Sequence, residues 1–478
     1  MKRTKIICTM GPNTNDPALM KALAQHGMDV ARFNFSHGDY EEQKERLNAL
    51  KSIREELGLP IAALLDTKGP EIRTGLLTDG KKITLKEGET YILTTEEIVG
   101  NDKKGHINYG GLNDDVTTGN RILIDDGLIE LEVLEVKGSE IICTIINGGE
   151  LGERKGVNVP NVKVKLPALT DKDIADIKFG IEQGFDFIAA SFVRTASAVN
   201  EIKDILAEYG SNIAVIAKIE NAEGIENIDE IIEASDGIMV ARGDMGVEIP
   251  AQKVPFIQKQ IIDKCNEACK PVITATQMLD SMIRNPRPTR AEVTDVANAV
   301  YDGTDAVMLS GETAMGKYPV EALSMMASIV EETEGHLDYS CYRQRKVSVF
   351  NTQNVSNAVS YSSVATAHDL GAKAIVAPSI TGFTTRLLSK WRPESMIIGL
   401  SPSASALRQM QLYWGVTPFQ ARRAESTDVL IYSSLELLKA KNIIEENDTI
   451  VVTAGVVSPA RKHEPAAHTN IMRVVTVD

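Results

Sequence analysis

Charged residues follow several short apolar runs in this sequence, at the points where predicted strands end. Glu220 and Asp244 are carboxylates, and proteins hold Mg²⁺ with one or two carboxylates together with water and substrate oxygens. Arg32, Arg73 and Lys218 are cations, which stabilise the charge that develops when a phosphoryl group is transferred. Together they predict metal-assisted chemistry on a phosphorylated substrate.

The carboxylates also have a structural explanation, in which Glu220 or Asp244 forms a salt bridge with Lys218 or Arg242. The segment Gly243-Asp244-Met245-Gly246 is similarly open to two interpretations. Glycines let the backbone approach a ligand, and a helix that starts here offers free N–H groups to a carboxylate. Paired glycines are equally typical of an ordinary turn.

Eight predicted strands alternate with amphipathic helical segments and would position these residues. Eight β/α units in succession predict a (β/α)₈ barrel, whose active site lies at the carboxyl ends of the strands. An open, doubly wound parallel sheet is the alternative. The predicted strands are 6–10, 30–35, 61–66, 187–191, 214–220, 237–241, 272–276 and 306–310.

A block of short alternating runs interrupts this pattern after the third strand and predicts an inserted all-β domain. Hairpin signals occur at Asp79-Gly80, Asp126-Gly127 and Gly148-Gly149. The β/α pattern resumes at Thr170, which resembles a helix cap. A polar joint at 331–354 precedes a further α/β unit, with strands expected at 374–377, 396–400, 449–453 and 472–477. The predicted domains are a barrel (1–69 and 168–340), an inserted β-barrel lid (70–167) and a C-terminal α/β regulatory domain (350–478).

Composition limits the classes of partner. The chain has 478 residues and a formal net charge of −15, which disfavours nucleic acid and anionic membranes as general partners. No apolar run approaches the roughly 20 residues of a membrane span. The five cysteines are scattered and complete no metal-ligand set, which is typical of reduced thiols and predicts a cytoplasmic protein.

Five motifs, in order along nearly the whole chain, resemble those of the pyruvate kinase family, of the bacterial type without an extra C-terminal domain. They are 65–75 (LDTKGPEIRTG), 216–221 (IAKIEN), 239–248 (MVARGDMGVE), 275–282 (ATQMLDSM) and 308–314 (MLSGETA). The resemblance implies transfer of the phosphoryl group of phosphoenolpyruvate to ADP, giving ATP and pyruvate, the last step of glycolysis. It also implies a Mg-bound enolpyruvate intermediate and a homotetramer.

The resemblance implies roles for the matching residues. Lys218 is similar to the lysine that stabilises the transferring phosphoryl group and the enolate oxygen, and Thr276 to the residue that relays a proton through water. Arg32 and Arg73 complete the expected catalytic set. The expected substrate-binding residues are Arg32, Lys218, Ala241, Gly243, Asp244 and Thr276, and the nucleotide-binding residues are Asn34, His37, Arg73 and Lys317.

The resemblance further implies two metal sites. Mg²⁺ (or Mn²⁺) is expected on Glu220 and Asp244. K⁺ is expected on four oxygen donors of low net charge, which equally suit a hydrogen-bond network at the strand ends: Asn34, Ser36, Asp66 and Thr67. Glu71 matches a family position where glutamate accompanies dependence on K⁺ and lysine accompanies independence.

A phosphate effector site is expected in the C-terminal unit, where hydroxyls, a glycine and a helix start follow a strand. The resemblance implies a sugar phosphate or AMP as effector. An ordinary helix-cap loop is the alternative. The expected effector residues are Ser379, Thr381, Gly382, Thr384, Thr385 and Arg461, with Lys462 and His463 beside the last.

Two other functions remain open. A barrel with the same metal and enolpyruvate could catalyse an aldol or mutase reaction, but the K⁺ set and the inserted lid disfavour it. An inactive homologue could bind metabolites as a regulator, but every matched catalytic position is filled. Pyruvate formation that depends on ADP would separate these functions.

Overall fold

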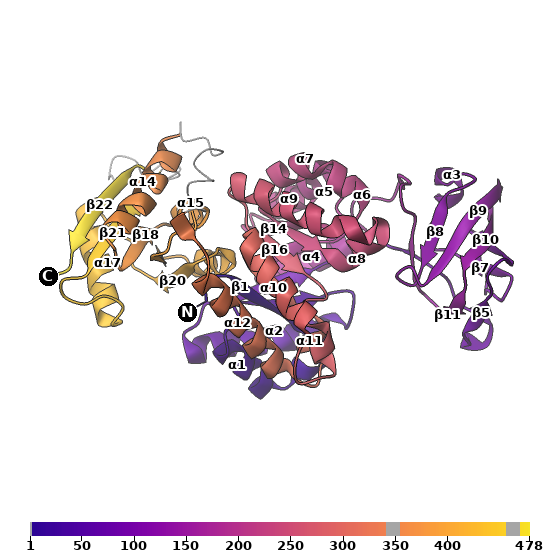
Figure 1. Ribbon diagram of the computed structural model, residues 1–478, viewed down its shortest axis with the longest axis horizontal. Coiled ribbons are helices and arrows are strands. Elements are labelled where there is room, and N and C mark those ends of the chain that lie inside the picture. The colour runs from indigo at the N-terminus through magenta and orange to yellow at the C-terminus, as the bar shows by residue number, and fades with distance from the viewer. Residues whose placement is uncertain (1, 341–353, 456–468) are drawn as a thin grey trace.

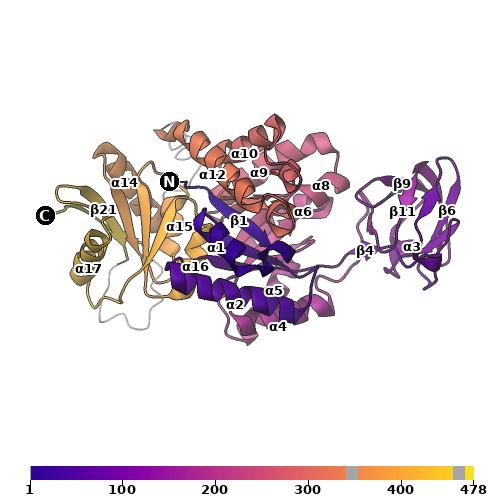
Figure 2. The same cartoon turned by 90° about the horizontal axis from the view of Figure 1, so that it is seen from below.

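A computed structural model describes residues 2–340, 354–455 and 469–478. It has three parts in a row, with the inserted β domain at one end, the barrel in the middle and the C-terminal unit at the other end (Figure 1). The amino-terminal segment lies at the junction of barrel and C-terminal unit (Figure 2), where Arg3 accepts from the Gly415 N–H at 2.9 Å.

The central part is a closed parallel barrel of eight strands, which confirms the predicted fold and excludes the open sheet. The strand cores are apolar and almost entirely buried, because both faces of a parallel strand are covered. The strands are β1 (Lys5–Met10), β2 (Val30–Asn34), β3 (Ala62–Asp66), β13 (Phe187–Ala190), β14 (Ala214–Ile219), β15 (Gly237–Ala241), β16 (Val272–Ala275) and β17 (Ala306–Leu309).

Local signals begin and end the covering helices. Thr170 caps α4 (Asp171–Gln183) in a capping box, as the sequence predicted, and Gly184 ends it in the left-handed conformation. The other principal helices of the barrel are α1 (Pro17–Gln25), α2 (Tyr40–Leu57), α5 (Ala196–Glu208), α6 (Ala222–Glu226), α7 (Ile228–Ala234), α8 (Arg242–Glu248), α9 (Val254–Glu267), α10 (Arg290–Asp302), α11 (Gly311–Ala314) and α12 (Pro319–Gly335).

An aspartate recurs before every second strand at the amino-terminal end of the barrel. One carboxylate oxygen of each accepts a backbone N–H near the start of the preceding strand, at 2.8 or 2.9 Å. These bonds join the strands in pairs. The four residues, called the aspartate ring below, are Asp29, Asp186, Asp236 and Asp305.

The inserted domain, called the lid below, is all-β, with its own apolar core. Its main sheet has the order β4 (Ile72–Arg73), β12 (Gly156–Asn158), β8 (Arg121–Ile124), β9 (Ile129–Lys137), β10 (Glu140–Asn147), β6 (Thr90–Thr94) and β7 (Lys104–His106). The strands β5 (Ile83–Leu85) and β11 (Gly149–Leu151) form a second, small sheet. A short helix, α3 (Leu112–Asp115), completes the lid.

One of the three hairpin signals is confirmed. Asp126-Gly127 joins the antiparallel pair β8 and β9. Asp79-Gly80 instead lies in a 3₁₀ turn, and Gly148-Gly149 leads from β10 into β11, which pairs with β5. Dipeptides of this kind mark a turn but do not specify which strand follows it.

The C-terminal unit is a five-stranded sheet with helices α14 (Val355–Asp369), α15 (Phe383–Ser389), α16 (Ala404–Gln409) and α17 (Thr427–Ala440). The strand order is β20 (Val416–Gln420), β19 (Met396–Ser401), β18 (Ala374–Pro378), β21 (Thr449–Ala454) and β22 (Ile471–Thr476), and only β22 is antiparallel to its neighbour. The edge strand β20 was missed because Pro418 interrupts its pattern, although an edge strand tolerates proline. The predicted joint also began too early, since α12 continues to Gly335.

Among the helices of the described residues, none is long and apolar enough to cross a membrane.

Candidate active site

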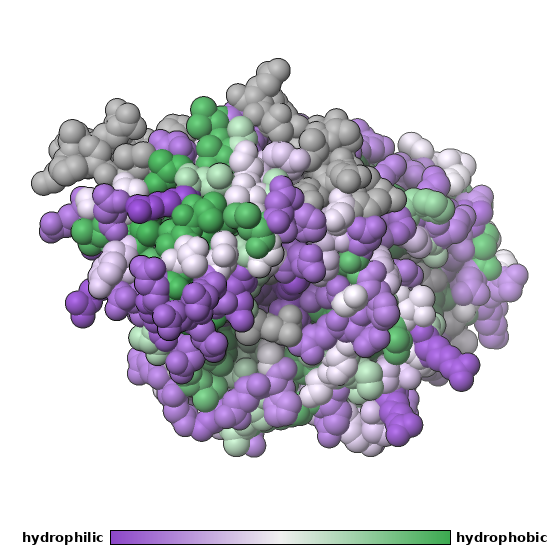
Figure 3. All heavy atoms as spheres, turned by 60° about the vertical axis from the view of Figure 1, so that its left-hand side comes forward, coloured by the Kyte–Doolittle hydropathy of each residue, from purple (hydrophilic) through white to green (hydrophobic). Residues whose placement is uncertain are grey.

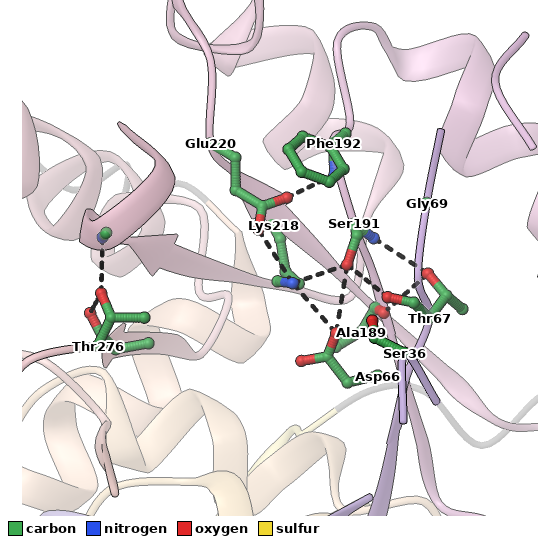
Figure 4. A network of polar contacts seen from close by, with 12 residues as sticks. Ser36, Asp66, Thr67, Gly69, Ala189, Ser191, Phe192, Lys218, Glu220 and Thr276 are labelled. Atoms are coloured by element: carbon green, nitrogen blue, oxygen red, sulfur yellow. Dashed lines mark hydrogen bonds and ion pairs between the residues drawn. The ribbon is translucent and has the colours of Figure 1, made fainter. Parts of the chain in front are cut away.

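A polar network joins the carboxyl ends of β2, β3, β13 and β14 (Figure 4). Asp66 is its centre. Its two carboxylate oxygens lie 2.6 Å from Arg32 Nε and 3.1 Å from Lys218 Nζ. Burial raises the pKa of Asp66, but the charges of Arg32 and Lys218 outweigh burial and hold the pKa below its ordinary value.

Lys218 is buried among oxygen atoms. Its Nζ lies 2.7 Å from Ser191 Oγ and 3.0 Å from Glu220 Oε1, in addition to its contact with Asp66. Burial lowers the pKa of Lys218, but the charges of Asp66 and Glu220 raise it above its ordinary value. Lys218 is therefore a fixed positive charge at the mouth of the barrel.

The carboxylates of Glu220 and Asp244 carry negative charge that the ammonium group of Lys218 does not fully offset. Burial and the charge of Asp244 together raise the pKa of Glu220 to about 7, against the charge of Lys218. Burial also raises the pKa of Asp244. Two carboxylates with raised pKa values, one buried and one half-buried, fit a divalent cation, which would hold both ionised. The described residues contain no group of three or more acidic, histidine or cysteine side chains placed to bind a metal.

The salt-bridge alternative is correct in part. Glu220 contacts Lys218, as that alternative expected. Arg242 pairs with a different carboxylate. It forms a bidentate ion pair with Asp295, at 2.6 and 2.7 Å, and donates to the Thr276 carbonyl at 2.7 Å. Arg242 therefore braces the loop after β16.

That loop places Thr276 opposite the first turn of α8. Thr276 Oγ1 accepts from the Gly243 N–H at 2.7 Å, and Ala241 is the last residue of β15. Thr276 and Gln277 have φ angles of 70° and 53°, in the left-handed region that such residues rarely adopt. Strain of this kind collects where surrounding structure fixes a backbone for function.

Two cavities lie between barrel and lid, and Arg73 lines both. The first, of about 380 Å³, is also lined by Asn221 and Asp244. The second, of about 740 Å³, is lined by Ser36 and His37. Arg73 forms an ion pair with Glu71 at 2.6 Å.

The residues expected to bind K⁺ lie on neighbouring strands. Asn34 and Asp66 face each other across β2 and β3. Asn34 Oδ1 accepts from the Ser36 N–H at 3.0 Å, and Thr67 Oγ1 accepts from the Ser191 N–H at 3.2 Å. Lys317 is exposed in the loop after α11 and lines neither cavity.

Two parts of the site were missed. Ser191 links Lys218, Asp66 and the Thr67 carbonyl, with its Oγ 2.6 Å from the last. Its signal was its position, as the polar end of the predicted fourth strand. The lid contributes Lys155, which lines the first cavity and contacts Asp125 at 2.9 Å.

The expected effector loop lies between β18 and α15. Thr381 is exposed, whereas Thr384 and Thr385 are buried. The Thr384 hydroxyl lies 2.9 Å from that of Thr469, and the Thr385 hydroxyl donates to the Gly382 carbonyl at 2.6 Å. Ser379 is half-buried, and Arg461, Lys462 and His463 lie outside the described residues.

Fold and site together define a (β/α)₈-barrel enzyme with an inserted β domain, in which one end of the barrel gathers cations and carboxylates. Two family models match the chain: the pyruvate kinase barrel domain at residues 1–323 and the pyruvate kinase alpha/beta domain at residues 357–475. The chain belongs to the pyruvate kinase family, and its function is that of a pyruvate kinase.

Comparisons with individual proteins support the same family assignment. The pyruvate kinases of Staphylococcus aureus strains MRSA252 and USA300 are each 50% identical over 458 residues, which is 95% of this chain and 78% of theirs. The crystal structure of a pyruvate kinase from Cryptosporidium parvum superposes with a TM-score of 0.94 and 41% identity, and the match covers 100% of this chain and 96% of that one.

Proposed function

We propose that this chain transfers the phosphoryl group of phosphoenolpyruvate to ADP through an enolpyruvate intermediate, with Mg²⁺ (or Mn²⁺) and K⁺ as cofactors. The observation that carries the proposal is the buried Lys218 charge, held between Asp66 and Glu220. A fixed cation at this position stabilises charge on a transferring phosphoryl group without reorganising during the reaction.

The other residues of the site have separate proposed roles in binding the substrate and in transferring a proton. Arg32 binds the phosphoryl group beside Lys218, and Arg73, from the lid side, binds between substrate and nucleotide. The backbone at Ala241 and Gly243 and the Thr276 hydroxyl hold the substrate carboxylate. Thr276 then passes a proton through water to the enolpyruvate carbon. The lid excludes water, which would otherwise compete with ADP for the phosphoryl group.

Cation binding follows from the oxygen donors. Glu220 and Asp244 would hold Mg²⁺, which would supply Lewis-acid polarisation of substrate oxygens. Asn34, Ser36, Asp66 and Thr67 would hold K⁺, which would supply further positive charge. His37, Asn34 and Lys317 complete the nucleotide side, with Lys317 reaching from its exposed loop.

The test is formation of pyruvate by the purified chain. Pyruvate should form from phosphoenolpyruvate only when ADP, Mg²⁺ and K⁺ are all present, with one ATP for each pyruvate. Consumption of phosphoenolpyruvate without ADP would favour aldol or mutase chemistry. Metabolite binding without turnover would favour the inactive regulator.

Regulation through the C-terminal unit belongs to the same proposal. A sugar phosphate or AMP binds the loop of Ser379, Thr381 and Gly382 at the start of α15, assisted by Arg461, and tightens phosphoenolpyruvate binding. Because Thr384 and Thr385 are buried, the exposed Thr381 is the better test position. Thr381→Glu should abolish activation while leaving unactivated turnover near native. Activation that survives Thr381→Glu would make the loop only a helix cap.

A homotetramer is the proposed assembly. Hydrophobic side chains gather on the face of the C-terminal unit that Figure 3 brings forward. Exposed apolar residues of this unit include Met472 and Val474 on the edge strand β22 and Tyr432 on α17. Exposed edges and apolar patches of this kind favour contact with another subunit. Sedimentation equilibrium should give four times the chain mass, and a monomer would refute the assembly.

A further inference from the structure

A cavity of about 280 Å³ lies between the amino-terminal end of the barrel and the C-terminal unit, at the opposite end of the strands from the candidate active site. The barrel side contributes Ile213, Asp236 and Pro271. The C-terminal unit contributes Phe383, Arg386 and Tyr413. Two charged residues of opposite sign therefore share a cavity whose walls are polar and apolar in about equal parts.

The aspartate ring explains why the two units leave a space here. Asp186 and Asp305 each form an ion pair with an arginine of the C-terminal unit, Arg408 at 2.7 Å and Arg392 at 2.8 Å. These contacts close the interface at two positions of the ring. Asp236 instead pairs with Lys203 of the barrel at 3.1 Å, so the corresponding position stays open.

Arg386 is the charged residue of the C-terminal unit that lines the cavity beside Asp236. Its Nε is buried and has no hydrogen-bond acceptor among the residues that the structure describes. A guanidinium donor left without an acceptor in a protein interior carries an energetic penalty, which an oxyanion would relieve. Arginine is also the residue best suited to a planar carboxylate.

The rest of the cavity restricts the anion. Asp236 borders the same space and repels a second negative charge, which disfavours phosphate dianions and dicarboxylates. The walls formed by Ile213, Pro271 and Phe383 suit a short apolar body. The volume equals that of roughly nine waters at about 30 Å³ each, enough for a branched acid of a few carbons.

We propose that this cavity is a binding site for a small monocarboxylate with an apolar body, which Arg386 holds by its carboxylate. Such a ligand contacts both units at once and stabilises their docking. Because Phe383 also belongs to the segment after Gly382, the ligand lies against the base of the loop at the start of α15.

Isothermal titration calorimetry on the full chain tests the site with three probes: 4-methylpentanoate, L-leucine and inorganic phosphate. The first two differ only by the ammonium group. Both should bind, and phosphate should not. Tighter binding of leucine would assign the ligand as an amino acid whose ammonium group faces Asp236, and tighter binding of 4-methylpentanoate would assign a plain carboxylate.

Matched variants separate the site from the interface. Arg386→Met should weaken binding of 4-methylpentanoate about tenfold or more, since a hydrogen bond to a charged group is lost. Arg408→Met removes an interdomain ion pair that does not line the cavity and should bind as the native chain does. Ile213→Trp fills the cavity and should abolish binding while turnover stays near native, which keeps the test valid if Arg386→Met unfolds.

Three results would overturn the proposal. They are no binding of either organic acid, unchanged affinity in Arg386→Met or Ile213→Trp, and phosphate binding tighter than both acids.

Discussion

Replacing Lys218 by methionine tests the proposed mechanism at its centre. The substitution keeps an apolar stem of similar length and removes the ammonium group that lies 3.1 Å from Asp66, 3.0 Å from Glu220 and 2.7 Å from Ser191. Losing one preorganised charge from a buried site removes about 3–4 kcal/mol of transition-state stabilisation, which corresponds to a rate lower by roughly a hundred- to a thousandfold.

The same substitution should destabilise the fold. Removing one partner of a buried ion pair leaves its carboxylates uncompensated, at a cost of about 3–5 kcal/mol. Turnover and stability must therefore be separated. Arg392→Met is the matched control, because Arg392 is a buried cation 2.8 Å from the Asp305 carboxylate at the opposite end of the barrel.

The assay measures ADP-dependent pyruvate formation together with urea unfolding for both variants. Both should lose stability, and only Lys218→Met should lose turnover by two orders of magnitude or more. Protonation of enolpyruvate supplied directly should persist in Lys218→Met, because Thr276 is the proposed proton relay. Near-native turnover in Lys218→Met, or an equal loss in Arg392→Met, would refute the reasoning.

Three further predictions concern the K⁺ site, the Mg²⁺ site and Lys5 at the start of β1. Glu71→Lys should give activity without K⁺, because its ammonium group replaces the missing cation, and the native chain should be inactive in buffer free of K⁺ and NH₄⁺; full native activity there would contradict the K⁺ site. Glu220→Gln should weaken Mn²⁺ binding, measured by electron paramagnetic resonance, at least tenfold if Glu220 is a ligand, and unchanged affinity would exclude it. Burial lowers the pKa of Lys5 to about 8 in the folded chain. The unfolded chain therefore binds more protons above pH 8, and stability should rise by about 1.6 kcal/mol between pH 8 and 9.5. Lys5→Met should flatten that rise in urea unfolding, and an unchanged slope would show that Lys5 is not its source.

The barrel could be predicted from the sequence because its strands are buried on both faces. Each forms a short apolar run that stands out against polar loops. The edge strand β20 lacked that signal, because Pro418 is tolerated only where one side of the strand has no partner. Turn dipeptides were less informative, since the pairing of β11 with β5 depends on a segment distant in sequence.

The sequence predicted which types of residue form the site. It predicted less well which residues contact one another there. Lys218 and Asp66 are separated by 152 positions, and Arg242 and Asp295 by 53. Closure of the barrel determines such pairs, and spacing along the chain does not. The same limit applies to Thr384, whose partner Thr469 lies on a segment 85 positions away.

Charge at the two ends of the barrel differs in a way that bears on its cofactors. At the amino-terminal end, each member of the aspartate ring pairs with at least one lysine or arginine. At the mouth, the three carboxyl groups of Asp66, Glu220 and Asp244 outnumber the two cations, Arg32 and Lys218. A substrate with a phosphate and a carboxylate adds more negative charge. Binding it in a buried site therefore requires added cations, and the mouth has carboxylate, amide and hydroxyl oxygens to hold them. On this argument, the proposed dependence on metal ions agrees with the charge of the site itself.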